Sequence, residues 1–333
     1  MFSPSSPHIF LSFRSAAQGS AFSSTAALRE LAHGTKKFAS FLVLTLLLGS
    51  VACAPPRGSG IVIGAKNFTE QVVLGELLAQ EIEAVYAAQG HPRHVQRRFY
   101  LAGSYICHQA LINGRIDAYV EYTGTALTAI LKQPLPAAKD RAAVFSTVRS
   151  LYAQRFHVRV EPELGFEDTF ALVMRRADAQ RERITTISGL KDHAQTMRLG
   201  VGYEFQARPD GLAGLEAAYG IHFRQPRVMD LGLLYRALSL GQVDVVAGNS
   251  TDGPIQALGL SVLEDNLHYF PPYDAVPLVR EDSLQRHPEI QVAMDRLAGR
   301  VDAQAMQTMN DAVDGKHQNV ENVVRKFRAQ RGL

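Results

Sequence analysis

The chain has 333 residues, of which 46% are hydrophobic and 20% are charged, a balance typical of globular proteins and a length sufficient for two domains. Its net charge of +3 arises from residues 1–52, which hold four of the 35 basic residues and one of the 32 acidic residues, so that 31 of each remain. The remainder is neutral and has no basic stripe, and we therefore expect no nucleic-acid partner.

Residues 1–53 predict a signal and lead segment. Lys36 and Lys37 precede the uncharged run FASFLVLTLLLGSVACA, whose apolar core is too short for a permanent membrane anchor. Two cleavage sites compete. SVAC resembles a lipobox, in which Cys53 is lipidated and becomes the mature N-terminus, whereas ACA at 52–54 fits ordinary signal peptidase. We favour lipidation of Cys53, and we expect an exported protein that is periplasmic or membrane-anchored as a lipoprotein.

A first unit of alternating strands and helices follows a short tether at residues 54–60. IVIGA predicts a buried strand, and the apolar spacing from Leu74 to Val85 predicts a helix. HVQRRFYLAG predicts a second strand and SYICHQALINGRI a helix. DAYVEYTGTALTAIL then predicts a short strand, a turn at Gly124 and another helix. This alternation is a βαβ pattern and favours a mostly parallel sheet.

A second unit begins near Gly165. TFALVMRR, MRLGVG and VDVVAG predict strands, NLHYFPPYDAVPLVR predicts an extended segment, and the residues from Asp282 onward predict helices. We therefore expect an α/β protein of two lobes, each a mostly parallel sheet flanked by helices. Residues 61–164 together with 271–333 would form lobe 1, and residues 165–270 would form lobe 2, with a ligand-binding cleft between them.

Polar and aromatic residues recur at the ends of the predicted strands, where ligands of open α/β sheets bind. One set suits a carboxylate, because Arg is a bidentate donor, Lys a point charge and Thr a hydroxyl donor: Lys66, Thr125 and Arg208. Another set offers aromatic faces and a negative charge, which suit a quaternary ammonium group: Tyr122, Phe170, Tyr273 and Asp168.

Enzyme motifs are absent from the sequence. It contains no G-x-S-x-G, P-loop, H-E-x-x-H or glycine-rich dinucleotide motif, and no Cys or His spacing typical of a metal site. We therefore expect no enzymatic activity, no metal and no cofactor. Cys107 is expected to be a packing residue. An enzyme on the same two-lobe scaffold, with Cys107 as a covalent attachment point, remains an alternative.

Six segments occur in the order typical of one transport family: GAKNFTEQVVLGELLAQ, IDAYVEYTGTAL, GFEDTFALVMR, YEFQARPDGLAGL, VDVVAGNSTDG and FPPYDAVPLVR. From about Ile61 to the C-terminus, the chain resembles the substrate-binding proteins of ABC importers for glycine betaine, choline, carnitine and related osmoprotectants. The resemblance implies a two-lobe periplasmic-binding-protein fold of type II that closes like a clamshell. It also implies delivery of the ligand to an ABC permease in the inner membrane.

The resemblance implies a role for each candidate residue. Lys66, Thr125 and Arg208 match positions that bind the ligand carboxylate. Tyr122 and Tyr273 match positions that form two aromatic walls around the ammonium group. Asp168 matches a position beside that group.

Phe170 and Asn249 replace residues that are more often tyrosines of the aromatic cage. Phe170 keeps a ring, whereas Asn249 removes one. A desolvated cation–π contact contributes up to about 2 kcal/mol, so the lost wall would weaken glycine betaine binding roughly tenfold or more. Alternatively, the opened space admits a larger betaine, or the amide bonds another ligand group. We expect a monomer that binds a glycine-betaine-like zwitterion, with an amino acid or a sulfur-containing betaine as the alternative ligand.

Overall fold

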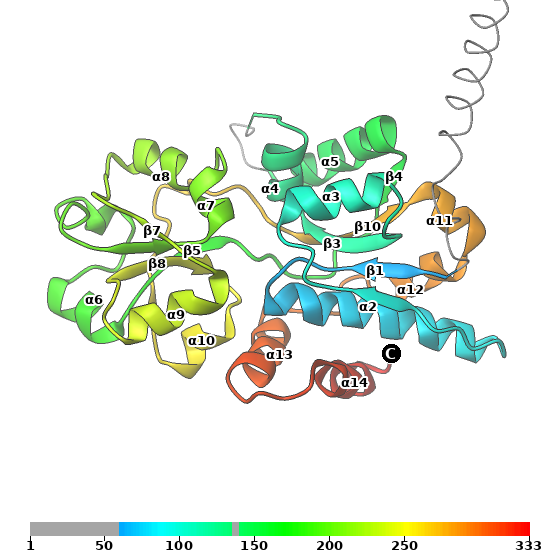
Figure 1. Ribbon diagram of the computed structural model, residues 1–333. Coiled ribbons are helices and arrows are strands. Elements are labelled where there is room, and N and C mark those ends of the chain that lie inside the picture. Colours follow the sequence, from blue (N-terminus) through cyan, green and yellow to red (C-terminus); the bar gives the residue numbers. More distant parts are fainter. Residues whose placement is uncertain (1–59, 135–139) are drawn as a thin grey trace, which may run out of the picture. The chain divides into compact units, whose positions relative to one another are not determined.

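The computed structural model describes residues 60–134 and 140–333, which form two five-stranded sheets flanked by helices (Figure 1). The expected signal and lead segment, with Cys53 and both cleavage alternatives, lies outside the described residues. Among the helices of residues 60–134 and 140–333, none combines the length and the apolar character needed to cross a membrane.

The first sheet has the strand order β2-β1-β3-β10-β4. Its strands are β1 (Val62–Gly64), β2 (Gln96–Arg98), β3 (Ala118–Tyr122), β4 (Val158–Val160) and β10 (Ala275–Arg280). Every residue of β3 is buried. Ala118, Val120 and Tyr122 belong to the apolar cluster shared with the leucines of α2, whereas Tyr119, on the opposite face, belongs to the cluster shared with α5, as the two-residue period of a strand requires. We call this sheet and its covering helices the first lobe.

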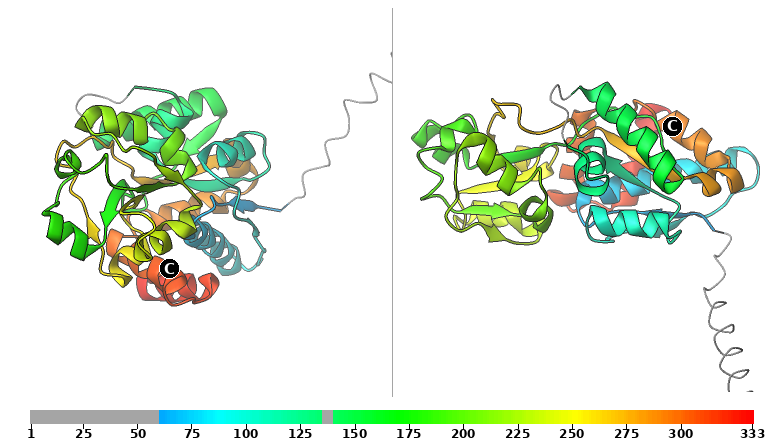
Figure 2. Two further views of the ribbon diagram at one scale, coloured as in Figure 1. Left: turned by 60° about the vertical axis from the view of Figure 1, so that its left-hand side comes forward. Right: turned by 90° about the horizontal axis from the view of Figure 1, so that it is seen from above.

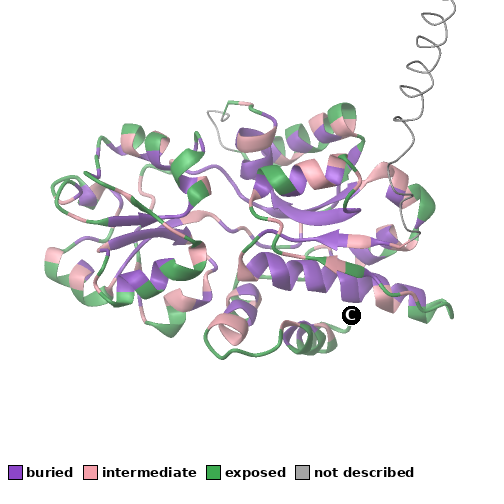
Figure 3. Ribbon diagram, in the orientation of Figure 1, coloured by how far each residue is buried: buried purple, intermediate pink, exposed green. Residues whose placement is uncertain are grey.

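The helices of the first lobe cover both faces of its sheet. They are α2 (Thr69–Ala88), α3 (Ser104–Ile112), α4 (Thr123–Thr125) with a π-helical turn (Ala126–Ile130), α5 (Arg141–Phe156), α11 (Glu281–Arg286), α12 (Glu289–Leu297), α13 (Ala303–Asp314) and α14 (Val320–Arg331). Of the 20 residues of α2, 15 are buried, because α12, α13 and α14 pack against it (Figure 3). The helical C-terminal region therefore completes the covering of α2.

The second sheet has the strand order β7-β6-β8-β5-β9. Its strands are β5 (Phe170–Met174), β6 (Leu199–Val201), β7 (Arg227–Val228), β8 (Val245–Asn249) and β9 (Ser261–Val262). Its helices are α6 (Arg176–Glu182), a 3₁₀ turn (Ser188–Leu190), α7 (Tyr203–Ala207), α8 (Leu212–Tyr219), α9 (Leu231–Ser239) and α10 (Gly253–Ala257). We call this sheet and its helices the second lobe. The chain boundaries given above for the two lobes remain a prediction.

The expectation of mostly parallel sheets is confirmed, because in each sheet four of the five strands run in the same direction and one runs against them. In the first sheet β1 pairs in parallel with β2 and β3, but β10 runs antiparallel to β3 and β4. In the second, β6 pairs in parallel with β7 and β8, but β5 runs antiparallel to β8 and β9. The reason is that β5 and β10 follow the two segments that pass between the sheets (Figure 2), and both enter against the direction of their neighbours.

Candidate functional site

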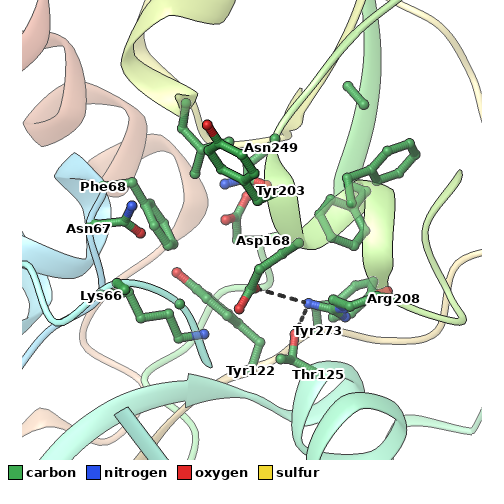
Figure 4. Close-up of a pocket in the computed structure, with 18 of the residues that line it drawn as sticks. Lys66, Asn67, Phe68, Tyr122, Thr125, Asp168, Tyr203, Arg208, Asn249 and Tyr273 are labelled. Atoms are coloured by element: carbon green, nitrogen blue, oxygen red, sulfur yellow. Dashed lines mark hydrogen bonds and ion pairs between the residues drawn. The ribbon is translucent and has the colours of Figure 1, made fainter. Parts of the chain in front are cut away.

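All eight candidate residues line one cavity of about 290 Å³ (Figure 4). The first lobe contributes Lys66, Tyr122 and Thr125, and the chain that enters or builds the second lobe contributes Asp168, Phe170, Arg208 and Asn249. Tyr273 lies in the segment that returns to the first lobe and leads into β10. A hydrogen bond joins the two segments that pass between the sheets: the backbone N–H of Asp168 donates to the carbonyl of Tyr273 at 3.1 Å.

Strand ends explain why these residues meet. Lys66 follows β1, Tyr122 ends β3, and Asn249 ends β8, so each lies at the carboxyl edge of a sheet with parallel pairings. Phe170 begins β5 and is paired with Asn249 in antiparallel register. The folding of local strand–loop–helix units therefore places the polar and aromatic side chains at two edges that border the same cavity.

Arg208 is held in place by a buried carboxylate. Its Nε and Nη2 donate to the two oxygens of Asp210 at 2.9 and 2.6 Å, and its Nη1 donates to Thr125 Oγ1 at 3.0 Å. Asp210 also accepts from the hydroxyls of Tyr273 at 2.7 Å and Thr128 at 2.9 Å. Burial opposes the ionisation of Asp210, but the hydrogen bonds and charge of Arg208 prevail and lower its pKa. The guanidinium orientation is therefore fixed within the protein.

Lys66 also has a buried carboxylate partner, Glu121, with which it forms an ion pair. Glu121 accepts further from the Tyr119 hydroxyl at 3.1 Å and from the backbone N–H of Tyr122 at 2.8 Å. The Nζ of Lys66 lies 4.8 Å from the centroid of the Tyr122 ring. Both cations among the candidate residues are thus already neutralised. A ligand that carries both charge signs matches such a site better than a simple anion does.

Asp168 belongs to a cluster of carboxyl groups with Glu70 and Asp252. Burial, and then the charges of Glu70 and Asp252, raise the pKa of Asp168 well above its usual value. Burial also raises the pKa of Glu70, and it raises the pKa of Asp252 to about 7. Glu70 accepts from the Tyr122 hydroxyl at 2.6 Å, and Asp168 accepts from the backbone N–H of Thr251 at 3.2 Å. A cation beside this cluster would favour its ionised form.

The aromatic candidates pack together as well as lining the cavity. The Phe170 ring lies edge-on to those of Phe205 and Tyr273, with centroid distances of 4.9 and 5.8 Å. The Cζ of Arg208 lies 4.8 Å from the Phe170 centroid, so this ring also contacts the guanidinium. A Cβ on Gly124 would lie 2.7 Å from the Tyr273 ring. The glycine in this turn therefore makes room for the ring.

Glu204 of α7 reaches across to the start of α3 in the first lobe. It accepts from the backbone N–H of Ser104 at 2.5 Å and from the Ser104 hydroxyl at 3.1 Å. Gly103 precedes this helix, and a Cβ there would overlap the Glu204 carboxylate. The carboxylate also lies 3.7 Å from Arg208 Nη1. The Glu204–Ser104 contact thus joins the lobes directly beside the cavity, with a negative charge at a helix N-terminus.

Several lining residues are missing from the candidates chosen by sequence. Tyr203 begins α7 and is 68% exposed, Glu204 follows it, and Asp230 precedes α9, where it accepts from the backbone N–H of Gly232 at 2.9 Å. Phe68 packs against the core and also lines the cavity. Tyr203 closely follows β6, and Asp230 closely follows β7. Several of the chosen candidates also follow strands, so this position in the sequence could have identified both residues.

Cys107 and His108 lie apart from this site, and neither lines the cavity. Cys107 is fully buried, and burial raises the pKa of its thiol to about 12, which makes it unreactive. His108 packs edge-on to Phe156 with a centroid distance of 4.6 Å, and burial lowers its pKa to about 4. In residues 60–134 and 140–333, no group of three or more His, Cys, Asp or Glu residues is arranged to hold a metal ion.

Known proteins resemble the chain over nearly all of its described length. Residues 59–330 match a family model described as the substrate binding domain of ABC-type glycine betaine transport system. The chain is 32% identical over 295 residues to the ergothioneine transport permease/ergothioneine binding protein EgtU of Helicobacter pylori (strain G27), covering 87% of this chain and 52% of that protein. It therefore spans about half the length of EgtU.

A second relative and one solved structure are covered almost completely. The chain is 31% identical over 302 residues to the carnitine transport binding protein OpuCC of Listeria monocytogenes serotype 1/2a, covering 88% of this chain and 96% of that protein. The crystal structure of a glycine betaine/carnitine/choline ABC transporter matches with a TM-score of 0.68 and 31% identity over 82% of this chain and 98% of that one. The expected two-lobe, type II periplasmic-binding-protein fold is thereby confirmed.

Proposed function

The chain belongs to the family of substrate-binding domains of ABC-type glycine betaine transport systems, and we propose that its ligand is a small zwitterion with a quaternary ammonium group and a carboxylate. As the solute-binding component of an ABC importer, the protein captures its ligand outside the cytoplasm and delivers it to a permease. One observation carries the ligand assignment: two buried cations, three aromatic rings and buried Asp168 converge on one cavity of about 290 Å³.

Arg208, Thr125 and Lys66 bind the ligand carboxylate in this proposal. Arg208 and Thr125 are joined by a hydrogen bond of 3.0 Å, so both donors can address the two oxygens of one carboxylate. Lys66 supplies a point charge from the opposite edge. Asp210 already orients Arg208 through two hydrogen bonds, which lowers the entropic cost of ordering the guanidinium when the ligand binds.

The rings of Tyr122, Phe170 and Tyr273 face the methylated ammonium group, with Asp168 and Asn249 beside it. A quaternary ammonium has no N–H to donate, so aromatic faces and a carboxylate are the groups that attract it. Burial raises the pKa of Asp168 and so shifts this carboxyl toward its protonated form in the free protein. The ligand cation favours ionisation of this carboxyl, and ligand binding therefore releases a proton.

The protein acts as a monomer, without a cofactor and without catalysis, in this proposal. The buried Cys107 thiol lies outside the cavity, which argues against a covalent attachment point. The segment SVAC supports lipidation of Cys53 and membrane anchoring, with ordinary cleavage after Ala54 as the alternative.

Ergothioneine, a sulfur-containing betaine, is the second ligand candidate. Its support comes from the 32% identity to EgtU, which is named for ergothioneine binding. Asn249 adds to that support, because an amide at the ammonium end leaves more space than an aromatic ring would. An unmodified amino acid is a weaker candidate, since its N–H groups would face aromatic rings.

Calorimetry of the purified protein against glycine betaine, choline, carnitine, proline betaine and ergothioneine tests the proposal. We expect at least one betaine to bind with a Kd well below about 1 mM. Acetate and tetramethylammonium each carry only one half of the zwitterion, and both should bind far more weakly than that betaine. If no betaine binds below about 1 mM, or if acetate binds as tightly as the best betaine, the proposal is wrong.

A further inference from the structure

A buried carboxylate behind the wall of the ligand cavity joins three separate parts of the fold. Glu70 lies in the first turn of α2 and does not line the ligand cavity. Its Oε1 accepts from the hydroxyl of Tyr122 at 2.6 Å, and its Oε2 accepts from the hydroxyl of Thr251 and from the side-chain amide of Asn310 at 3.0 Å. These partners belong to β3, to the turn between β8 and α10, and to α13. The first sheet, the second lobe and the C-terminal helices therefore meet at one side chain.

Thr251 carries the connection back to the ligand cavity. Its backbone N–H donates to Asp168 Oδ1 at 3.2 Å, and its backbone carbonyl accepts from the Asn310 amide at 2.9 Å. Like Glu70, Thr251 is buried and does not line the ligand cavity. A series of hydrogen bonds therefore starts at Tyr122, passes through these two buried residues and ends at Asp168. We call this series the bridge, and both of its ends line the ligand cavity.

A glycine allows the turn that carries Thr251 to lie directly against α13. Gly253 begins α10, and a Cβ at this position would lie 2.6 Å from the backbone nitrogen of Asp311. A side chain there would therefore push α10 away from α13. The side-chain amide of Gln307, also in α13, donates to the backbone carbonyl of Ser250 at 3.2 Å. Close packing and a hydrogen bond thus hold the second-lobe end of the bridge in place.

We propose that Glu70 and Thr251 are positioning residues for the ammonium end of the ligand. They touch no ligand group themselves, and they act by fixing the Tyr122 ring and the Asp168 carboxyl relative to each other. A cation between an aromatic face and a carboxyl group is sensitive to both distances, because each attraction falls as the groups move apart. This inference rests on the proposed function, in which the ammonium group lies beside Tyr122 and Asp168.

Two substitutions that each remove one hydroxyl group test the inference. Tyr122→Phe keeps an aromatic face toward the ligand and removes the donor to Glu70, whereas Thr251→Val keeps the branched side chain and removes the other donor. Calorimetry uses the betaine that binds the unaltered protein most tightly. We expect each substitution to raise the Kd about fivefold to tenfold, because the lost hydrogen bond to a buried carboxylate releases the groups that it holds. Thr251→Ser restores the hydroxyl and should recover most of the affinity.

The two ends of the bridge should act as one unit. The double variant Tyr122→Phe/Thr251→Val should therefore raise the Kd by clearly less than the product of the two single factors. Tyr152→Phe is the matched control and should leave the Kd unchanged, because this buried hydroxyl lies outside the ligand cavity and has no hydrogen-bond partner within residues 60–134 and 140–333. Gly253→Ala should weaken binding as Thr251→Val does, by moving α10 away from α13.

Denaturant unfolding of the same variants separates positioning of the ligand site from support of the fold. If Thr251→Val lowers the free energy of unfolding but keeps the Kd within about twofold of the unaltered protein, the bridge only stabilises the fold and the inference is overturned. Full multiplication of the two single effects, or no recovery with Thr251→Ser, also overturns it. If no betaine binds the unaltered protein, the proposed function is wrong and the inference falls with it. If a betaine binds the unaltered protein and both hydroxyl variants equally well, only the inference fails.

Discussion

The Glu204–Ser104 contact is expected to set how long the ligand stays bound. Glu204→Asp tests this, because it keeps the negative charge near Arg208 but shortens the side chain by one methylene, out of reach of Ser104. The change removes two hydrogen bonds to a charged acceptor, of 2.5 and 3.1 Å. Such bonds contribute about 1.5–3 kcal/mol each when buried.

The exposure of Glu204 to solvent reduces the free energy that these hydrogen bonds contribute. Its side chain is 39% exposed, and solvent screens the interaction. We therefore take about 1–2 kcal/mol for the whole contact, which is a factor of about 5–30 in the closing equilibrium. The apparent Kd varies inversely with the population of the closed form, so it should rise by up to the same factor. The increase should appear mainly in the dissociation rate, as most affinity changes among variants of one site do.

Calorimetry gives the Kd and stopped-flow fluorescence gives the dissociation rate. The control is Glu182→Asp, a glutamate at the end of α6 that does not line the cavity. Gly103→Ala is an independent check, since its Cβ would push the Glu204 carboxylate away from α3. A Kd for Glu204→Asp within about twofold of the unaltered protein would refute the reasoning, and tighter binding would show that Glu204 mainly competes with the ligand for Arg208.

Further predictions concern charge, protonation and the buried thiol. Arg208→Gln should raise the Kd for a betaine roughly 10- to 100-fold by calorimetry, because charge-assisted hydrogen bonds contribute about 1.5–3 kcal/mol, with exposed Arg181→Gln as control. Since the pKa of Asp168 is raised in the free protein, affinity should increase with pH and level off above that pKa, and calorimetry in buffers of different ionisation enthalpy should detect a released proton. Asp168→Asn should abolish both effects, and a pH-dependent affinity in that variant would assign the proton elsewhere. Cys107→Ser should leave ligand affinity unchanged but lower the free energy of unfolding by about 1–3 kcal/mol, whereas lost affinity would return Cys107 to the site.

Local sequence patterns predicted the positions of the candidate residues better than they predicted the contacts between them. Lys66, Tyr122 and Asn249 could be chosen because each follows a strand, and a strand–loop–helix unit is a local feature. The ion pair of Lys66 with Glu121 could not be predicted from the sequence, because it depends on which face of β3 points toward the loop. The two cations looked available for a ligand in the sequence, whereas each has a carboxylate partner in the fold.

The antiparallel strands and the contacts between lobes lay beyond local patterns. A run such as AVPLVR looks the same in either direction, so the pairing of β10 against β3 depends on how the chain returns from the second lobe. Tyr203 follows a predicted strand, as several chosen candidates do, but no local pattern places it or Glu204 at a cavity. They border the cavity only because the first lobe faces the start of α7, and this arrangement is a property of the whole chain.

The neutralised cations of the cavity have a consequence for the medium in which the protein works. A site that attracts its ligand through unpaired surface charge loses affinity as ionic strength rises, because the Debye length falls to roughly 3 Å at 1 M salt. Here Arg208 and Lys66 are buried beside their own carboxylates, and the proposed ligand has no net charge. Capture should therefore change little between dilute buffer and concentrated salt.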